Sequence, residues 1–284
     1  MKIGIVGQGF VGSAIYEGLK TFYNVKTYDL DENKRNCDSL HELIQESQII
    51  FQCLPTPMKK SGECDIRIVE SSLYNIDKIC LNSFADEERR IVVIKSTVPP
   101  GTTKMLDSKF DNIDVIFSPE FLTEANSYED FKNQTRIILG GSRPATTIVK
   151  TMFKKAFPEI PIVKTGSGTA EMVKYFTNCF LATKVSFSNE IYQICQANSI
   201  DYDKVTEYAL HDTRLGRSHF AVPGPDGDFG FGGHCFPKDL SAMVYIAENS
   251  NIDSTILKSV QTKNDMVRKN RDWEAMKGRA VSED

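Results

Sequence analysis

An apolar run followed by a glycine-rich turn opens the chain and constrains its fold more than any other feature. Lys2–Val6 has the character of a buried strand and leads directly into Gly7-Gln8-Gly9-Phe10-Val11-Gly12, after which a helical pattern begins. In strand–turn–helix units of this kind the first glycine makes a tight turn and the third lets the helix pack closely on the strand. The opening therefore predicts the first unit of a doubly wound α/β sheet.

The same alternation of short β-rich runs and helical stretches continues to about residue 165, which predicts a parallel sheet with crossover helices. Several runs are apolar on both faces, as central parallel strands should be. The expected strands are Lys2–Val6, Asn24–Tyr28, Ile49–Cys53, Ile91–Lys95, Asp114–Phe117 and Arg136–Gly140. We therefore predict a Rossmann-type domain over residues 1–165, with Pro158–Gly168 as a loop to the next domain.

A different pattern follows this loop. Residues 169–198 contain neither proline nor glycine and carry apolar residues at helical spacing, which predicts one helix of about eight turns. Shorter helices are expected at 201–211 and 238–249, with a glycine-rich loop at 223–233. The prediction is an all-helical domain over 166–267 built on one long helix. Residues 268–284 form a charged tail that we expect to fray or to dock only weakly.

Composition excludes several classes of function. The net charge is −4 and no basic run is present, so we expect no nucleic-acid partner. No apolar stretch approaches the length needed to span a bilayer. The seven cysteines show no CxxC spacing and are odd in number, which favours reduced thiols in a cytoplasm. With only four scattered histidines we expect no metal site.

The glycine turn also predicts a dinucleotide site. Gly9 lets the backbone approach a pyrophosphate, and the helix N-terminus faces it with its positive dipole end. Asp29 ends the second expected strand at the distance where an acid accepts the ribose hydroxyls. Because this carboxylate would repel a 2′-phosphate, we predict NAD rather than NADP as the cofactor. Lys34 could assist on the adenosine side, although an exposed surface lysine would look the same.

Three further segments follow expected strands: Leu54–Pro57, Lys95–Thr103 and Ser118–Glu124. Open α/β sheets bind ligands at these carboxyl ends, but proline-stiffened turns would give the same pattern. Glu120 and Glu124 are four residues apart and would share a helix face, either in a site or as a solvated helix start.

Glu171, Lys174 and Asn178 share one face of the long expected helix. Such a row could point into a closed site or form a solvated stripe, and the sequence alone leaves both readings open.

One cysteine lies in a setting suited to chemistry. Gly230-Phe231-Gly232-Gly233-His234-Cys235 continues into Phe236-Pro237-Lys238-Asp239, so a thiol in a glycine-rich loop precedes a lysine and a carboxylate. Neighbouring charges can shift a thiol towards the reactive thiolate. A lone cysteine is more often a buried packing residue, but this one indicates covalent chemistry at a carbon that a thiolate can hold.

Taken in order, these motifs resemble the UDP-glucose/GDP-mannose dehydrogenase family from Met1 to about Asn264. The resemblance rests on Gly7–Gly12, Pro55–Pro57, Ser96–Thr103, Pro119–Glu124, Glu171-x-x-Lys174-x-x-x-Asn178, Asn189-Glu190, Asp212-x-Arg214 and Gly230–Asp239. It implies oxidation of the C6 alcohol of a nucleotide sugar, with UDP-glucose as the expected substrate, to a carboxylate with two NAD⁺ and one water. Relatives dimerise through the long helix, so a homodimer is expected.

The resemblance also assigns site residues. The implied catalytic set is Cys235, Lys174, Asn178, Asp239, Glu124, Glu120 and Thr97. The implied cofactor set is Gly7, Gly9, Phe10, Val11, Gly12, Asp29, Lys34, Pro55, Thr56, Thr97 and Glu124. The implied substrate set is Glu120, Phe121, Leu122, Lys174, Asn178, Arg214, Phe229, Gly230, Gly232 and Gly233.

By the same resemblance, the Cys235 thiolate would add to the aldehyde formed in a first oxidation and give a thiohemiacetal, because an aldehyde has no alkoxide to expel a hydride. A second oxidation would give a thioester that water hydrolyses. Lys174 and Asn178 would stabilise developing oxyanions. Asp239 would orient or activate water, and Glu124 is a candidate general base. Arg214 matches a position that in relatives reaches the substrate, including the substrate bound across a subunit interface.

Departures from the family pattern keep other functions open. Ala125 stands where relatives usually have glycine, the loop over 223–230 is longer than usual, and the chain ends about where relatives begin a nucleotide-gripping third domain. One alternative is a two-electron β-hydroxyacid-type dehydrogenase, which would release one NADH per substrate. The other is a silent NAD-binding protein that pairs with a separate nucleotide-binding chain.

Overall fold

The computed structural model describes residues 1–84 and 89–283, which form two compact units. The first unit comprises Met1–Thr56 and Ile66–Lys174. The second comprises Pro57–Asp65 and the chain from Tyr175 onward. Each unit is therefore assembled from segments that are not contiguous in sequence.

The first unit contains a seven-stranded sheet in the order β2-β1-β3-β4-β5-β6-β7. The strands are β1 (Lys2–Val6), β2 (Asn24–Tyr28), β3 (Ile49–Gln52), β4 (Arg90–Ile94), β5 (Ile113–Phe117), β6 (Ile137–Gly140) and β7 (Ile162–Thr165). Strands β1 to β5 pair in parallel, and β6 pairs antiparallel with β5 at Phe117 and Gly140. The predicted doubly wound sheet is confirmed. Its order reverses between β1 and β3, and such a switch point is where open α/β sheets bind ligands.

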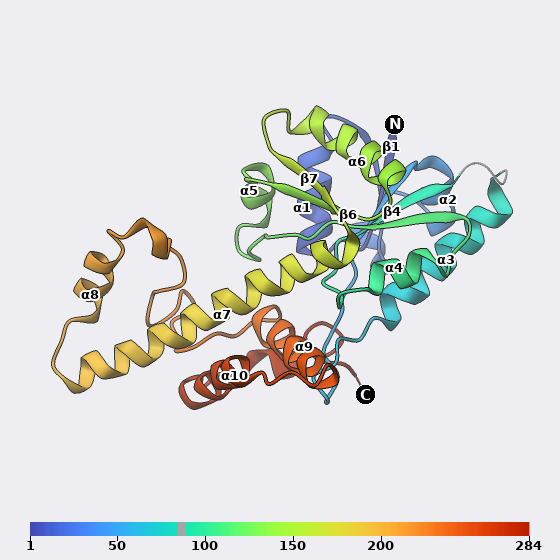
Figure 1. Cartoon of the computed structure of the whole chain (residues 1–284). Helices are drawn as coiled ribbons and strands as arrows, with labels where there is room; N and C mark the ends of the chain where they lie inside the picture. Colours follow the sequence, from blue (N-terminus) through green and yellow to red (C-terminus); the bar gives the residue numbers. More distant parts are fainter. Residues whose placement is uncertain (85–88, 284) are drawn as a thin grey trace. The chain divides into compact units, whose positions relative to one another are not determined.

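Helices cover both faces of this sheet (Figure 1). On one face lie α1 (Phe10–Leu19), α5 (Ser127–Lys132) and α6 (Arg143–Ala156); on the other lie α2 (Leu40–Glu46), α3 (Arg67–Ser83) and α4 (Thr102–Asp107). The sheet residues alternate between the two cores because successive strand side chains point to opposite faces. Phe51 and Val93 belong to the first core, whereas Ile50 and Val92 belong to the second.

Strand β7 corrects one prediction, since Ile162–Thr165 lies in the stretch expected to be a loop. Its four residues pair in parallel with β6. The strand is short, lies at the sheet edge and has two exposed residues, so it lacks the apolar run that marks the inner strands.

The second unit is helical. Helix α7 (Ser167–Ala197) begins in the first unit and continues into the second, which also contains α8 (Tyr202–Ala209), α9 (Phe236–Asn249) and α10 (Thr255–Val267). Short 3₁₀ segments occur at Glu32–Lys34, Thr213–Leu215 and Asp272–Ala275. A core of Cys179, Ala182, Phe231, Leu240 and Val260 joins α7, α9, α10 and the loop before α9. The prediction of a helical region built on one long helix is confirmed. Within the described part of the chain, no helix combines the length and apolarity needed to cross a membrane.

The described part of the C-terminal tail docks, contrary to the expectation of fraying. Trp273 and Ala280 are buried. The backbone N–H of Met58 donates to the carbonyl of Ala280 at 2.9 Å, and that of Ser282 donates to the carbonyl of Met58 at 2.8 Å. The partner of the tail lies more than 200 positions earlier in the chain, so no local pattern could reveal the docking.

Candidate active site

The glycine turn after β1 has the geometry of a phosphate site. Gly7 has a φ of +91°, and a Cβ there would lie 2.3 Å from the carbonyl oxygen of Cys53. A Cβ on Gly12 would lie 1.9 Å from the carbonyl oxygen of Gly7, so neither position accepts a side chain. A Cβ on Gly9 would meet no atom within 4 Å, and no side chain caps the N-terminus of α1. Open space thus fronts a helix N-terminus, which suits a pyrophosphate.

Asp29 is fixed beside this turn at the end of β2. Its carboxylate accepts the backbone N–H of Gln8 at 2.6 Å and that of Asp31 at 2.9 Å. A carboxylate has about four acceptor positions, so lone pairs remain for the hydroxyls of a ribose. Lys34 is exposed and pairs with Asp31 at 3.4 Å. The residues around the turn therefore fit a dinucleotide. Lys34 already has an acidic partner in Asp31, as an ordinary surface lysine would.

The proline-rich turns after β3 and β4 are bonded to each other. The Thr56 hydroxyl donates to the carbonyl of Thr97 at 2.8 Å, and the Ser96 hydroxyl donates to the carbonyl of Leu54 at 2.6 Å. Thr56 and Thr97 are buried. Because β3 and β4 are neighbours in the sheet, these bonds make one continuous rim at its carboxyl edge, next to the strand that carries Gly7.

The segment after β5 differs from its predicted form. Residues 118–126 are not helical, and the helix that follows begins only at Ser127. Glu120 is buried and Glu124 is exposed, so the prediction that they share a helix face is wrong. The buried contacts of Glu120 hold this segment in a non-helical form that helical spacing could not anticipate.

A buried ion pair links this segment to the part of α7 that belongs to the first unit. The Lys174 ammonium donates to the Glu120 carboxylate at 2.9 Å and to the Glu120 carbonyl at 2.7 Å. The other carboxylate oxygen accepts the backbone N–H of Leu122 at 2.7 Å. Burial opposes ionisation of Glu120, but Lys174 and the Leu122 N–H outweigh it and hold the pKa of Glu120 below its usual value. The Glu120 carboxylate is thus ionised at neutral pH.

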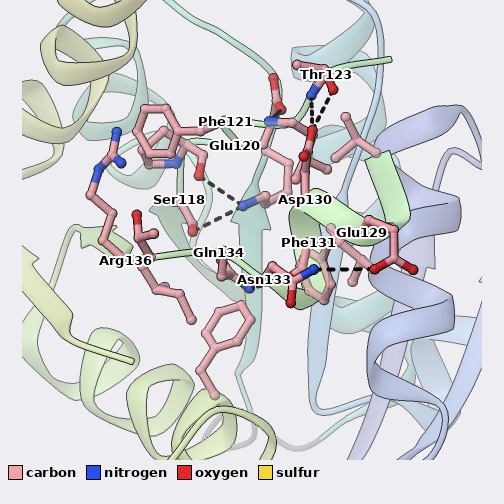
Figure 2. Close-up of a pocket in the computed structure, with 18 residues that line it drawn as sticks. Ser118, Glu120, Phe121, Thr123, Glu129, Asp130, Phe131, Asn133, Gln134 and Arg136 are labelled. Carbon is pink, nitrogen blue, oxygen red and sulfur yellow. Dashed lines mark hydrogen bonds between the residues drawn. The ribbon is translucent and has the colours of Figure 1, made fainter. Parts of the chain in front are cut away.

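A cavity of about 320 Å³ lies against this segment in the first unit (Figure 2). Among the predicted site residues, Val11, Glu120, Phe121 and Leu122 line it. The Arg136 guanidinium lies 4.0 Å from the centre of the Phe121 ring. On another side the Asp130 carboxylate accepts the backbone N–H of Thr123 at 2.7 Å, as Figure 2 shows. The first unit therefore gathers three of the predicted substrate residues around one cavity.

Lys95 also lines this cavity and was not among the predicted site residues. Its ammonium donates to the Ser118 hydroxyl at 3.3 Å and to the Pro119 carbonyl at 3.2 Å. Burial lowers the pKa of Lys95 to about 8, although Cys53 and Glu120 favour its charged form. A lysine at the very end of an apolar strand, directly before the Ser96-Thr97 motif, was the signal that could have identified it.

The depressed pKa of Lys95 predicts a pH effect on stability. Burial penalises the charged ammonium below about pH 8, and the penalty disappears as pH rises towards the ordinary value of 10.5. The unfolded chain binds the extra proton in this window, so stability rises with pH. The free energy of unfolding of the wild type should gain up to about 3 kcal/mol relative to Lys95→Met between pH 7 and pH 10. Urea titrations of both proteins test this, and a difference independent of pH would contradict it.

Glu171 has a structural role that the sequence did not reveal. Its buried carboxylate accepts the backbone N–H of Gly101 at 2.6 Å and that of Thr103 at 2.7 Å, which satisfies the N-terminus of α4. Lys174 and Asn178, one and two turns further along α7, are also buried. The reading of this row as a solvated stripe is therefore wrong.

In the second unit, the predicted nucleophile lies directly before α9. The Cys235 carbonyl accepts the backbone N–H of Asp239 at 3.0 Å, so Cys235 is the N-cap residue of the turn that contains Asp239. Asp239 is buried, and its carboxylate accepts the Asn178 amide at 2.6 Å and forms an ion pair with Lys238. Cys235, Asp239 and Asn178 are thus brought together within one unit.

Lys238 is the second functional candidate that the predicted set lacked. Burial alone would lower its pKa, but Asp239, Cys64 and Cys235 together raise it above the usual value. Lys238 is therefore a permanent cation whose charge acts on the Cys235 sulfur. A cation and a helix N-terminus are the surroundings that favour a thiolate.

Several other predicted residues have local partners. Arg214 is exposed and its guanidinium binds the Asp212 carboxylate, with Nε–O distances of 2.9 and 3.0 Å. The Phe229 ring packs on Tyr192 at a centroid distance of 5.6 Å. The N–H groups of Gly230 and Gly233 are bonded to Asn189 and Asp272 within the second unit.

Residues 14–157 match the NAD binding domain of the UDP-glucose/GDP-mannose dehydrogenase family, and residues 168–266 match its central domain. UDP-glucose 6-dehydrogenase TuaD of Bacillus subtilis is 34% identical over 247 residues, which are 84% of this chain and 51% of that protein. The match to an NAD binding domain confirms the prediction of NAD as cofactor.

Solved structures show the same fold. A UDP-glucose dehydrogenase from Pyrobaculum islandicum superimposes with a TM-score of 0.84 at 27% identity, covering 93% of this chain and 68% of that one. A 3-hydroxyisobutyrate dehydrogenase of Mycobacterium tuberculosis has a TM-score of 0.70 at 12% identity, covering 92% and 91%, and shares the fold alone. The chain spans about half the length of several curated relatives, including the TuaD protein at 51% and the Rickettsia bellii enzyme at 50%.

Proposed function

Since the chain belongs to the UDP-glucose/GDP-mannose dehydrogenase family, we propose that it oxidises the C6 alcohol of a nucleotide sugar to a carboxylate, with UDP-glucose as the substrate. The observation that carries this proposal is the Cys235–Asp239–Asn178 arrangement together with the Lys174–Glu120 ion pair. The first provides a nucleophile for a carbonyl carbon, and the second provides a fixed buried cation. The TuaD protein is named a UDP-glucose 6-dehydrogenase and the Pyrobaculum protein a UDP-glucose dehydrogenase, which supports UDP-glucose as the proposed substrate.

When bound, NAD⁺ would supply the hydride acceptor, and a second NAD⁺ would replace the NADH before the second of the two oxidations. The glycine turn and Asp29 would hold the dinucleotide, and the joined turns that contain Thr56 and Thr97 form the neighbouring rim of the sheet. Glu124 is the proposed base that takes the proton of the C6 hydroxyl as the alcohol becomes an aldehyde. Its exposure lets that proton pass to water.

The Cys235 thiolate then adds to the aldehyde carbon, forming a C–S bond and a thiohemiacetal alkoxide. This oxygen re-forms the C=O bond as the second hydride leaves the C6 carbon, which gives a thioester. The resulting thioester is attacked by water, and the C–S bond breaks with the thiolate as leaving group. Lys174 and Asn178 stabilise the oxyanions of these steps. Asp239, held by Asn178 and Lys238, orients the attacking water.

The stoichiometry of NADH formation tests the function. With limiting UDP-glucose, two NADH per sugar are expected, since the thiol adduct makes the second oxidation possible. GDP-mannose and UDP-N-acetylmannosamine serve as parallel substrates that identify the sugar. A ratio of one with a small hydroxy acid, and none with nucleotide sugars, would favour the two-electron dehydrogenase whose fold is shared. NAD binding without any turnover would favour the silent NAD-binding protein.

Exposed aromatic side chains on α7 support a homodimer through this helix. Phe176, Phe180, Phe187 and Ile194 are each at least half exposed, and the rings of Phe176 and Phe180 stack at 6.3 Å. Phe180, Phe187 and Ile194 recur every seven residues, so they follow one side of the helix. Such a contiguous apolar row marks an interaction surface.

Phe180→Asp combined with Phe187→Asp is expected to convert a dimer into a monomer of 31.9 kDa, because the introduced charges cannot be buried at the helix contact. Light scattering at micromolar concentration measures the masses. Phe22→Asp, at an exposed phenylalanine of the first unit, is the control and should remain dimeric. A monomeric wild type would contradict the proposed dimer.

A further inference from the structure

The loop Gly230–Cys235, here called the cysteine loop, is held through its backbone by side chains of the second unit. The N–H of Gly230 donates to Asn189 at 3.1 Å, and that of Phe231 donates to Asn264 at 2.7 Å. The N–H of Gly233 donates to both carboxylate oxygens of Asp272, each at 3.1 Å. Asp272 thus binds the loop backbone at Gly233, two residues before the proposed nucleophile Cys235.

Asp272 is itself held by a buried arginine. The Arg268 side chain is only 2% exposed, and its guanidinium lies 2.6 Å from Asp226, 3.5 Å from Asp272 and 3.6 Å from Asp228. Its Nε also donates to the carbonyl of Asn270 at 2.7 Å. One buried cation therefore joins three carboxylates from two segments, the long loop before the cysteine and the tail after α10.

The cysteine loop lies directly on this ionic cluster. A Cβ on Gly232 would be 2.3 Å from an Arg268 nitrogen and 2.4 Å from an Asp272 oxygen. A side chain at this position would displace the Arg268 and Asp272 groups from where they lie. The Asp228 carboxylate adds a second connection, because it accepts the backbone N–H of Asn270 at 3.0 Å. Hydrogen bonds from Asn270 and Phe229 lower the pKa of Asp228 and keep it ionised in the cluster.

We propose that Arg268 and Asp272 are positioning residues that fix the cysteine loop and thereby set the location of the Cys235 sulfur. Phe231 packs in the core, but the three glycines of this loop have no side chain to pack, so the geometry around them depends on bonds made to the backbone. Hydrogen bonds to charged acceptors are the stronger kind. The catalytic value of this positioning rests on the proposed function, since a thiolate must meet a carbonyl carbon at close range.

Amide hydrogen exchange of the cysteine loop tests the proposal without any substrate. Asp272→Ala should accelerate exchange at Gly233 by about tenfold or more, the effect of losing one bond to a charged acceptor. Asp272→Asn retains a side-chain oxygen and should show a smaller increase. Exchange in α10 should stay at the wild-type rate, because the change acts on the loop rather than on the whole unit.

Arg271→Met is the matched control. Arg271 lies on the same segment, but its side chain is 43% exposed and pairs with Asp265 and Glu274. The Arg271→Met variant should leave the amide exchange rate of the cysteine loop unchanged. Arg268→Met should raise this rate, and Arg268→Lys should raise it less. If Arg268→Met does not fold, the Asp272 variants carry the test.

Kinetics provide the second readout. Asp272→Ala should lower kcat for nucleotide-sugar oxidation by about tenfold or more, while the Kd for NAD stays within about twofold, because Asp272 belongs to the second unit. Wild-type exchange of the cysteine loop in Asp272→Ala, an equal acceleration throughout α10, or an equal effect of Arg271→Met would each overturn the proposal. Absence of nucleotide-sugar oxidation in the wild type would overturn the proposed function and leave the exchange result to decide the positioning role.

Discussion

Cys235→Ala is expected to lower the steady-state rate of nucleotide-sugar oxidation by about a thousandfold or more, which is the scale of loss when a covalent nucleophile is removed. Without the sulfur, the aldehyde has no adduct from which a second hydride can leave. Stopped-flow absorbance at the NADH band measures the reaction. The first oxidation should still give at most one NADH per active site.

Cys195→Ala is the matched control for this change. Cys195 lies on α7 of the same unit and is buried beside Tyr202 and Val222, remote in sequence from the cysteine loop. It should retain wild-type turnover. Wild-type rates and two NADH per sugar in Cys235→Ala would rule out the thioester route and the assignment of Cys235 with it.

Lys174→Met is expected to cause the largest loss of stability, about 3–5 kcal/mol, because it leaves the Glu120 carboxylate buried without its cation. Turnover should fall by at least about a hundredfold through loss of oxyanion stabilisation. Urea unfolding and NADH assays measure the two effects separately. Lys184→Met, at the half-buried lysine further along α7, should affect both far less.

The double variant Lys174→Met with Glu120→Gln separates the two roles. Removing both charges should restore stability to within about 2 kcal/mol of the wild type, since no unpaired charge remains, but turnover should stay low. Recovery of turnover in the double variant would show that Lys174 acts only by pairing with Glu120.

The destabilisation by Lys174→Met should also depend on pH. In the wild type, the depressed pKa of Glu120 contributes stability above the ordinary carboxyl range, and this stability is lost as pH falls through the folded-state value. In the variant, the buried acid can protonate instead. The difference between the two proteins should therefore shrink between pH 7 and about pH 4.

The parallel sheet and the cofactor turn could be predicted because their signals are local. An apolar run before Gly7 and an acid at Asp29 follow directly from the chemistry of a strand–turn–helix unit. The long helix α7 could likewise be read from 30 residues without proline or glycine.

Features that depend on distant partners could not be read in this way. Glu171 has the spacing of a site residue. Its carboxylate, however, accepts hydrogen bonds from the backbone N–H groups of Gly101 and Thr103, which lie 70 and 68 positions earlier. Glu120 follows a strand and has helical spacing to Glu124, yet its ion pair with Lys174 spans 54 positions. Only the folded structure shows which polar side chains near a site form hydrogen bonds with the backbone and which pair with each other.

The pairing of residues 57–65 with the tail has a consequence for the order of folding during synthesis. The Ser282 hydroxyl binds the Asp65 carboxylate, a separation of 217 residues. At about 5–20 residues per second, the ribosome needs roughly 10–40 s to make this intervening chain. The sheet of the first unit can form well before the partners of residues 57–65 emerge. The second unit can be completed only after residues 280–282 have been made. Expressing the first unit alone would therefore leave residues 57–65 as an unsatisfied hairpin, and a short turn joining Thr56 to Ile66 would be the rational replacement.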